Sequence, residues 1–439
     1  MKILSGLMLF WVMSVTAQIP VDVQQEVDLR IKHKHNPSIA LAVFQGGHQS
    51  FYVKGWQNKE QQIPATVNTV YEIGSITKTF TGLLLAKLTE EGKVSLHDPV
   101  EQHWQQPFKL RDAAGEVITL KQLSTHTSGL PRLPDNLPLF ADDPYATYDR
   151  DDLLKALSNI KPAIAGKNYA YSNLAVGLLG ETLANAGGAS YNELISKNII
   201  QPLSLHSTYW SLQQVPEANL AQGYSVNKPT PAWNFKALAG AGALRSSITD
   251  LLAYGVAYLE QSDSLKKAMN IATTAHYQQD KLRVGLGWHI NDDIIWHNGG
   301  TGGFRSILMI NPKTQKVVAA ITNHSQNDVE DLAIHLMDTA QPMHQLDFPV
   351  EIESTKLKEF ESEYQQVEND SQITIKVIDD QLFFTAPKQP KQTMYYIGND
   401  TFKFKMINVK IKFDRDDNGN IQALQLQGWG EPQTYLKKD

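Results

Sequence analysis

Ser75 and Lys78 are spaced so that a lysine amine can lie beside a serine hydroxyl. The stretch Ser75-Ile76-Thr77-Lys78 begins a long apolar segment, and residues three apart share one face of a helix. A serine hydroxyl is a weak nucleophile that needs a neighbouring base, and a lysine whose pKa is lowered can supply one. The pair predicts acyl transfer through a serine ester, whereas the structural alternative is an N-cap serine.

The Ser-x-x-Lys spacing is weak evidence by itself, because it also occurs at Ser158, Ser225 and Ser264. Only the first match stands at the start of a strongly apolar helical pattern, residues 75–94, and the other three are expected on the surface. The apolar positions expected on the buried side of this helix are Phe80, Leu83, Leu84 and Leu88, and Gly92 is expected to close it.

Two further motifs carry groups that could serve the same reaction. Tyr171-Ser172-Asn173 places a phenol for proton transfer two residues before an amide for a substrate carbonyl, although Asn173 could instead cap the following helix. The stretch 297–304 (HNGGTGGF) begins with His297 and is rich in glycine, which lets another backbone approach a strand edge closely. The N–H groups of Gly300 and Ser75 could together form an oxyanion hole.

The composition is that of a large globular protein. The chain has 439 residues, of which 42% are hydrophobic, and it has no cysteine. Disulfide scaffolds, thiol catalysis and cysteine-ligated metals are thereby excluded. The formal charge of −6 gives no basic field for nucleic acid. We expect no metal site, because the 13 histidines form no H-E-x-x-H or other ligand pattern.

The first 17 residues have the pattern of a secretory signal peptide. Lys2 precedes a short apolar run from Leu7 to Val15, which ends in small residues at Thr16 and Ala17. Cleavage is predicted after Ala17, which makes the mature protein secreted, and periplasmic in a bacterium with two membranes. No run in the chain is long enough to predict a transmembrane segment.

The order of the predicted elements indicates an α+β fold. A helix at residues 21–35 and a hairpin at 38–56 precede a helical middle, and strands at 283–323 precede a helix at 328–340. This order of strands, then helices, then strands fits a single antiparallel sheet flanked by helices. Strands from both ends of the domain would complete this sheet. We expect this domain to cover residues 18–345.

Residues 350–439 predict a separate, small all-β domain of the barrel type. Short alternating segments are separated by turn residues. Asp414-x-Asp416-x-Asn418-Gly419 matches the first half of a calcium-binding loop, but Gln425 stands where that loop needs glutamate. A polar hairpin turn is the preferred interpretation.

Taken together and in this order, the three motifs resemble those of the serine β-lactamases of class C and the related D-alanyl-D-alanine carboxypeptidases and esterases. The resemblance covers roughly residues 21–345, and the tail resembles a lipocalin-like barrel appended to some members. The supporting stretches are YEIGSITKTFTG (71–82), ITLKQLSTHTSGLP (118–131), YSNLAVGLLG (171–180), GAGALRSS (240–247) and GLGWHI (285–290).

The resemblance implies a role for each matched residue. Ser75 would be the acylated nucleophile, and Lys78 and Tyr171 would share general base and acid catalysis. Asn173 would orient the amide of the substrate, with His297 and Gly299 flanking it and Gly300 in the oxyanion hole. The resemblance gives His126 no chemical role, so we expect it to be part of the scaffold. The family resemblance implies no cofactor either.

One position departs from the class C pattern, which has Lys-Thr-Gly where this chain has His-Asn-Gly. A lysine holds a permanent charge for a substrate carboxylate, whereas a histidine with the usual pKa of about 6.5 is mostly neutral at pH 7. Arg305 could supply the missing charge, or it could simply be solvated.

The sequence therefore predicts a serine hydrolase for β-lactams or D-Ala-containing, peptidoglycan-derived peptides. A carboxylesterase on the same scaffold is an alternative, as is a penicillin-binding sensor or scaffold that deacylates slowly. A typical α/β-hydrolase is disfavoured, because Gly-x-Ser-x-Gly does not occur. The oligomeric state and the choice among these substrates stay open.

Overall fold

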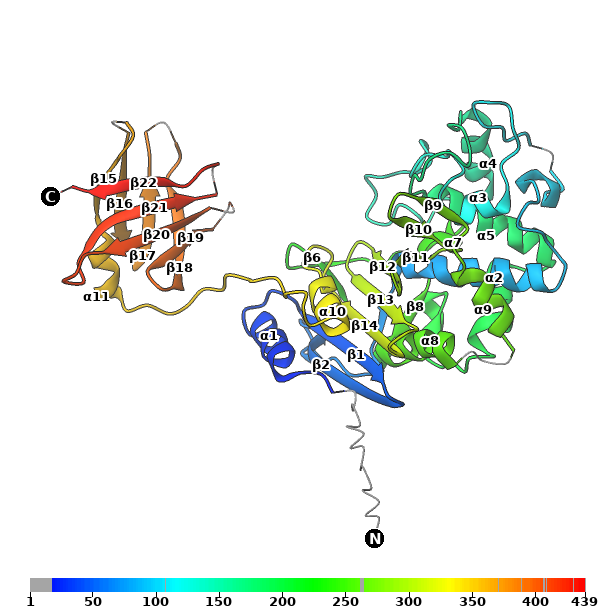
Figure 1. Ribbon diagram of the computed structural model, residues 1–439, viewed down its shortest axis with the longest axis horizontal. Helices are drawn as coiled ribbons and strands as arrows, with labels where there is room; N and C mark the ends of the chain where they lie inside the picture. Colours follow the sequence, from blue (N-terminus) through cyan, green and yellow to red (C-terminus); the bar gives the residue numbers. More distant parts are fainter. Residues whose placement is uncertain are drawn as a thin grey trace, which may run out of the picture. The chain divides into compact units, whose positions relative to one another are not determined.

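The computed structural model describes residues 18–106, 108–260, 264–369, 371–387, 389–405, 407, 409–428 and 430–438. The predicted signal peptide, residues 1–17, lies outside the described part. The chain divides into two compact units, one up to Met343 and one from His344 onward, and each has its own sheet (Figure 1). No helix among the described residues is long and apolar enough to cross a membrane.

The larger unit is built on a nine-stranded antiparallel sheet. Its first strand, β1 (Ser38–Gln45), pairs with its last, β14 (Lys316–Thr322), and the order across the sheet is β3-β2-β1-β14-β13-β12-β11-β10-β9. The other strands are β2 (His48–Asn58), β3 (Ile63–Pro64), β9 (Tyr277–Gln279), β10 (Leu282–Val284), β11 (His289–Asn291), β12 (Ile294–Gly300) and β13 (Arg305–Asn311). The predicted sheet, completed by both ends of the domain, is confirmed.

Helices cover both faces of this sheet, which explains the uninterrupted apolar sequence of β1 (SIALAVFQ). One face packs on α1 (Val21–Lys32) and α10 (Glu330–Met337). The other face packs on α8 (Ile248–Glu260). Because alternate residues of a strand point to opposite faces, Leu41 joins the first core and Ala42 joins the second.

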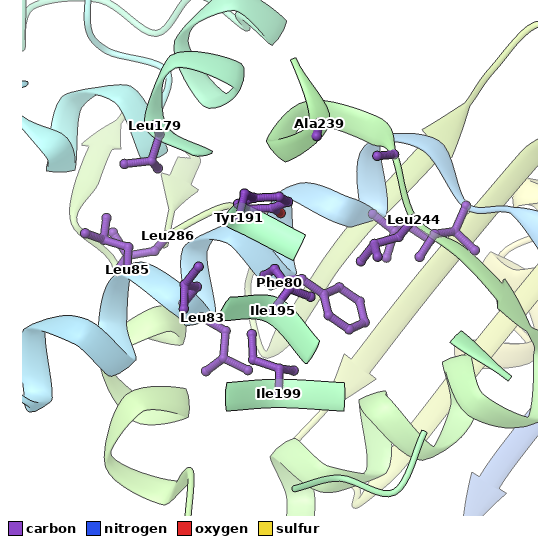
Figure 2. Close-up of a cluster of buried hydrophobic side chains, with 14 of the residues drawn as sticks. Phe80, Leu83, Leu85, Leu179, Tyr191, Ile195, Ile199, Ala239, Leu244 and Leu286 are labelled. Atoms are coloured by element: carbon purple, nitrogen blue, oxygen red, sulfur yellow. The ribbon is translucent and has the colours of Figure 1, made fainter. Parts of the chain in front are cut away.

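The helical middle of the chain surrounds α2 (Thr77–Glu90), and Figure 2 shows part of the core around this helix. The sequence predicted one buried side, but every residue from Thr77 to Ala86 is buried, because other elements pack around this part of the helix. The helices that contact α2 are α3 (Leu120–Ser124), α5 (Asn173–Gly187), α6 (Tyr191–Ile195), α7 (Ala239–Gly242) and α9 (Lys266–Thr273), and α4 (Arg150–Asn159) belongs to the same helical region. Two small sheets join β4 (Val70–Glu72), β8 (Arg245–Ser247) and β5 (Thr208–Tyr209), and β6 (Gly223–Ser225) with β7 (Lys228–Thr230).

The smaller unit is a closed antiparallel barrel, as the alternating tail sequence predicted. Its strands run in chain order from β15 to β22, and β15 pairs with β22 to close the barrel. They are β15 (Ser362–Gln366), β16 (Gln372–Ile378), β17 (Gln381–Thr385), β18 (Gln392–Gly398), β19 (Thr401–Phe404), β20 (Lys410–Arg415), β21 (Ile421–Gln427) and β22 (Gln433–Lys437). The calcium-like stretch forms the turn between β20 and β21, where Asp416 Oδ1 accepts the backbone N–H groups of Asn418 and Asn420.

Candidate active site

Ser75 lies in a tight turn between a strand and a helix. It occupies the single 3₁₀ turn η1 (Gly74–Ile76), and α2 begins at Thr77 rather than at Ser75 as the sequence predicted. Ser75 is not the N-cap of this helix, because Ile76 occupies that position. The turn leaves Ser75 half-buried, and Ser75 lines a cavity.

The amine of Lys78 lies beside the hydroxyl of Ser75. Lys78 Nζ is 2.9 Å from Ser75 Oγ and donates a hydrogen bond to the Ala241 carbonyl oxygen at 2.6 Å. The side chain is fully buried. Burial lowers the pKa of Lys78 well below its usual value, and the positive charge of Arg132 lowers it further. A lowered pKa makes the neutral, proton-accepting form of the amine easier to reach.

The phenol of Tyr171 lies against the same amine. Lys78 Nζ is 4.9 Å from the centre of the Tyr171 ring, and the guanidinium carbon of Arg132 is 5.1 Å from it. The His126 ring packs against Tyr171 at a tilt of 31°, with a centroid separation of 4.4 Å. Burial raises the pKa of Tyr171 to about 12, against the opposing effects of a hydrogen bond with Ser75 and the charge of Arg132. Tyr171 is therefore a protonated phenol at neutral pH.

Asn173 is the first residue of α5, but Ser172 caps this helix, so the sequence alternative of an Asn173 cap is wrong. Ser172 Oγ accepts the backbone N–H of Ala175 at 2.9 Å and donates to the Pro131 carbonyl oxygen at 2.6 Å. Asn173 Oδ1 is buried without a hydrogen-bond partner among the described residues, and the residue lines the cavity beside Ser75. Its amide is therefore not used for capping.

The glycine-rich strand β12 passes very close to the turn that holds Ser75. A Cβ at Gly299 would lie 2.0 Å from the Ile73 carbonyl oxygen, and a Cβ at Gly74 would lie 2.7 Å from Gly300 N. Gly74 also has a φ of +48°, which L side chains rarely adopt. These contacts bring the backbone of Gly300 beside Ser75, and only glycine permits them.

His297 lies directly behind the residues that line the cavity, with its ring 6.2 Å from that of Tyr171. His297 is buried, and the cavity is lined by His289 instead. The two rings lie 5.1 Å apart, and Tyr169 Oη is 3.2 Å from His289 Nε2. Burial lowers the pKa of His297 well below its usual value, and the charges of His289 and Lys78 act in the same direction. The role of His297 beside a substrate remains a prediction.

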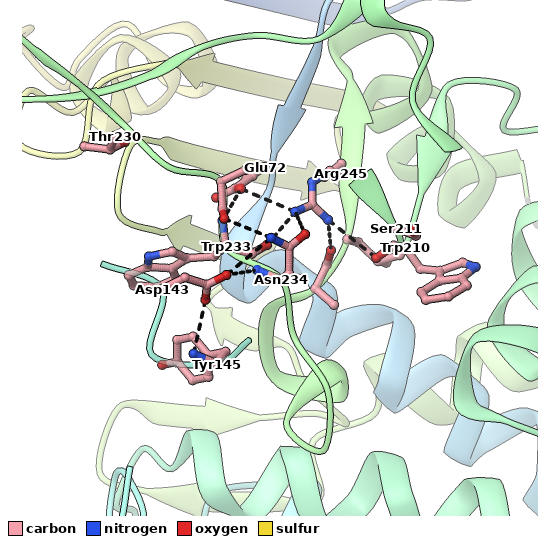
Figure 3. A network of polar contacts seen from close by, with 12 residues as sticks. Glu72, Asp143, Tyr145, Trp210, Ser211, Thr230, Trp233, Asn234 and Arg245 are labelled. Carbon is pink, nitrogen blue, oxygen red and sulfur yellow. Dashed lines mark hydrogen bonds and ion pairs between the residues drawn. The ribbon is translucent and has the colours of Figure 1, made fainter. Parts of the chain in front are cut away.

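A network of buried polar contacts holds one wall of the cavity. Glu72 Oε1 accepts the backbone N–H of Trp233 at 2.8 Å and lies 3.5 Å from Arg245 Nη2, which also donates to the Trp233 carbonyl oxygen. Asp143 Oδ2 accepts the backbone N–H of Asn234 at 2.7 Å. Figure 3 shows how these contacts join Glu72, Arg245, Trp233, Asn234 and Asp143 into one group. The group ties the segment around Trp233 to β4, which ends just before the Ser75 turn.

The cavity has a volume of about 470 Å³ and brings together residues from distant parts of the chain. It is lined by Ser75, Arg132, Leu133, Tyr145, Tyr171, Asn173, Trp233, His289, Asn298, Gly299, Gly300, Thr301 and Arg305. The sequence did not predict Arg132, Tyr145, Trp233 or His289 as site residues. Two of them stand at stretches that carry the family resemblance: Arg132 directly follows 118–131, and His289 lies within 285–290. No local pattern marked Tyr145 or Trp233.

The Beta-lactamase family model matches residues 23–341. The chain belongs to the beta-lactamase family. The match covers the whole of the larger unit except its ends, including the Ser75 turn, Tyr171 and β12. This membership and the mixed fold, with antiparallel sheets and an added barrel, confirm the resemblance found in the sequence.

Curated relatives and a solved structure agree with this family. The chain is 29% identical over 280 residues to "Beta-lactamase" from Escherichia coli (strain K12), which covers 63% of this chain and 71% of the relative. It is 28% identical over 339 residues to "Protein flp" from Staphylococcus aureus (strain COL), covering 72% of this chain and 66% of that protein, slightly under two thirds of its length. The octameric penicillin-binding protein homologue from Pyrococcus abyssi is similar in structure, with a TM-score of 0.68 and 25% identity. That match covers 94% of this chain and 99% of the other.

Proposed function

We propose that this beta-lactamase family protein is a serine hydrolase that cleaves amide bonds of β-lactams or of peptides ending in D-alanine. The observation that carries the proposal is the 2.9 Å separation between Ser75 Oγ and the buried amine of Lys78. A buried amine with a lowered pKa is the kind of base that a serine nucleophile requires. The geometry does not distinguish the two substrate classes.

In the first step, Ser75 Oγ attacks the substrate carbonyl carbon and its proton passes to Lys78. The neutral amine can take this proton because its hydrogen bond to the Ala241 carbonyl oxygen uses an N–H and leaves the lone pair available. The backbone N–H groups of Ser75 and Gly300 stabilise the oxyanion. The C–N bond then breaks, and Tyr171 with Lys78 delivers a proton to the leaving nitrogen.

In the second step, water attacks the Ser75 ester and regenerates the hydroxyl. Lys78 and Tyr171 serve again as base and acid, so no cofactor enters this scheme. Asn173 and Gly299, which line the cavity, would orient the substrate amide. We further propose that the signal sequence exports the protein, which would expose it to cell-wall peptides and to β-lactams.

A second candidate is a penicillin-binding protein that is acylated but deacylates slowly. The structural relative described as a penicillin-binding protein homologue favours this possibility. An esterase is the third candidate, because the same acyl-enzyme chemistry cleaves activated esters more easily than amides.

The three candidates are distinguished by intact-mass spectrometry of the mature protein during incubation with a fluorescent penicillin, beside Ser75→Ala. Drug loss without a lasting adduct would indicate a β-lactamase, and a persistent Ser75-dependent adduct would indicate a peptidase or a sensor. Ester turnover with no adduct and no drug loss would support the esterase. Full activity in Ser75→Ala would overturn the nucleophile assignment.

A further inference from the structure

We propose that Arg132 and Arg305 together bind an anionic group, a carboxylate in particular, on the acyl part of the substrate. The inference rests on the proposed function and names the chemical class of its acyl donor. Both arginines line the cavity beside Ser75, and no aspartate or glutamate is among the lining residues. A cavity with two guanidinium groups and no carboxylate in its lining favours an anion.

Neither arginine forms an ion pair with a carboxylate among the described residues. The arginines that form ion pairs among the described residues are Arg30, Arg111, Arg150, Arg245 and Arg415. The two carboxylates in the network of Figure 3 are already bonded, Glu72 to Trp233 and Arg245, and Asp143 to Asn234. A substrate anion therefore meets little competition from the protein.

Arg132 combines a fixed backbone with an exposed side chain. Its carbonyl oxygen accepts the backbone N–H groups of Asn173 at 2.9 Å and Leu174 at 3.3 Å, which ties it to the start of α5. Its guanidinium lies over the Tyr171 ring and is not buried. The charge is thereby held next to Asn173, the residue proposed to orient the acyl amide.

Arg305 is held at the start of β13, beside Gly300. The two residues are paired across β12 and β13, and Arg305 Nε donates to the Ser325 carbonyl oxygen at 2.7 Å. A Cβ at Gly300 would lie 3.0 Å from Arg305 Nη1. Arg305 Nη1 is thus positioned beside Gly300.

This position changes the role that the sequence suggested for Arg305. Class C enzymes have a lysine at the position of His297. This position lies three residues from Gly300 along β12, roughly 10 Å away at 3.3 Å per residue. Arg305 therefore does not replace the lysine that class C enzymes have at the position of His297. It lines the same cavity as Arg132, together with Asn173 and Gly299, which are proposed to orient the substrate amide, and Gly300 of the proposed oxyanion hole. A carboxylate there could accept hydrogen bonds from either guanidinium.

The test compares two activated esters that differ only on the acyl side. The p-nitrophenyl monoester of adipic acid carries a free carboxylate, and its methyl ester is neutral and similar in size. We expect wild-type kcat/KM to be about tenfold higher for the carboxylate, as expected for one charge-assisted contact. The rate of Ser75→Ala is subtracted in each case.

The arginine variants identify the source of this preference. Arg132→Gln and Arg305→Gln should each lower the ratio of the two kcat/KM values severalfold, and the double variant should bring it to about one. Arg132→Lys should keep part of the preference, and high salt should reduce it. Arg283→Gln is the matched control, because Arg283 also forms no ion pair among the described residues and is not in the cavity lining.

The outcomes separate this inference from the proposed function. If neither ester shows Ser75-dependent turnover, the proposed function fails and the inference falls with it. If both esters are hydrolysed at equal rates by the wild type, or if the double variant keeps the preference, only the inference is overturned.

Discussion

The backbone of Gly299 lies so close to Ile73 that a Cβ at Gly299 would be 2.0 Å from the Ile73 carbonyl oxygen. This contact joins β12 to the turn that carries Ser75, although more than two hundred residues separate them in the chain. Gly299 Cβ would also lie 2.5 Å from Ser306 Oγ, on the neighbouring strand. The distance between the strand and the nucleophile is thus set by the absence of a side chain.

We expect Gly299→Ala to abolish acylation of Ser75 and to destabilise the protein by about 1–3 kcal/mol or more, because the added methyl group overlaps rigid backbone. The measurements are the acylation rate by intact mass and the urea midpoint. Gly115→Ala is the control, since Gly115 has a φ of +85° with no atom within 4 Å of its Cβ position. Gly115→Ala should lower the free energy of unfolding by about 1–2 kcal/mol through backbone strain alone, and it should leave acylation intact. Normal acylation in Gly299→Ala would contradict the close contact.

Lys78→Met should remove activity while increasing stability near neutral pH. The pKa of Lys78 is lowered in the folded protein and close to 10.4 in the unfolded chain. Between these two pKa values, the unfolded chain binds one proton more than the folded protein. The contribution of Lys78 to the free energy of unfolding therefore rises with pH, by about 1.4 kcal/mol per pH unit. The methionine variant lacks this dependence.

The advantage of Lys78→Met over the wild type should therefore shrink between pH 7 and pH 10, as measured by urea unfolding at both values. Lys313→Met serves as the control, because the side chain of Lys313 is 75% exposed. A stability difference that is the same at both pH values would show that the amine stays protonated in the folded protein.

Arg245→Met should destabilise the larger unit by about 3–5 kcal/mol, because it leaves the buried carboxylate of Glu72 without its cation. The carboxylate and the guanidinium are both nearly inaccessible, at 6% and 2% exposure. KM for the substrate should rise, since Arg245 also holds the segment of Trp233, a residue of the cavity wall. Denaturant unfolding and steady-state kinetics measure the two effects.

The double variant Glu72→Gln/Arg245→Met provides the internal check. It should lose less stability than the sum of the two single variants, because the unpaired charge is gone. Strict additivity would show that the ion pair contributes nothing as a pair. Lys313→Ala, in an exposed pair with Asp293, should cost less than about 1 kcal/mol.

A fragment of residues 18–343 should fold and retain Ser75-dependent acylation. Every residue that lines the cavity belongs to the larger unit, and the barrel has a hydrophobic core of its own. Circular dichroism, denaturant unfolding and acylation by a fluorescent penicillin measure the outcome for this fragment. A folded fragment that is not acylated would show that the barrel is required for the reaction.

Much of the fold follows from local patterns in the sequence. The alternating tail segments predicted the barrel, and the apolar strands at both ends of the larger unit predicted their place in one sheet. The extent of burial around α2 could not be predicted, because the amphipathic pattern shows only that one side is apolar. Threonine side chains such as Thr81 can be buried because their hydroxyls have hydrogen-bond acceptors, in this case the carbonyl oxygen of Gly240 at 2.7 Å, which lies far away in the chain.

The sequence by itself determined the chemical groups of the candidate site: the serine, lysine, phenol, amide and glycine-rich strand each stand in a motif only a few residues long. Tertiary structure alone decided that His289 rather than His297 lines the cavity, and that Tyr145, Trp233, Arg132 and Arg305 surround Ser75. The physical reason is that motif spacing reports neighbours along one helix or strand. A cavity wall depends on loops whose positions are fixed by contacts between distant residues, such as Glu72 with Arg245.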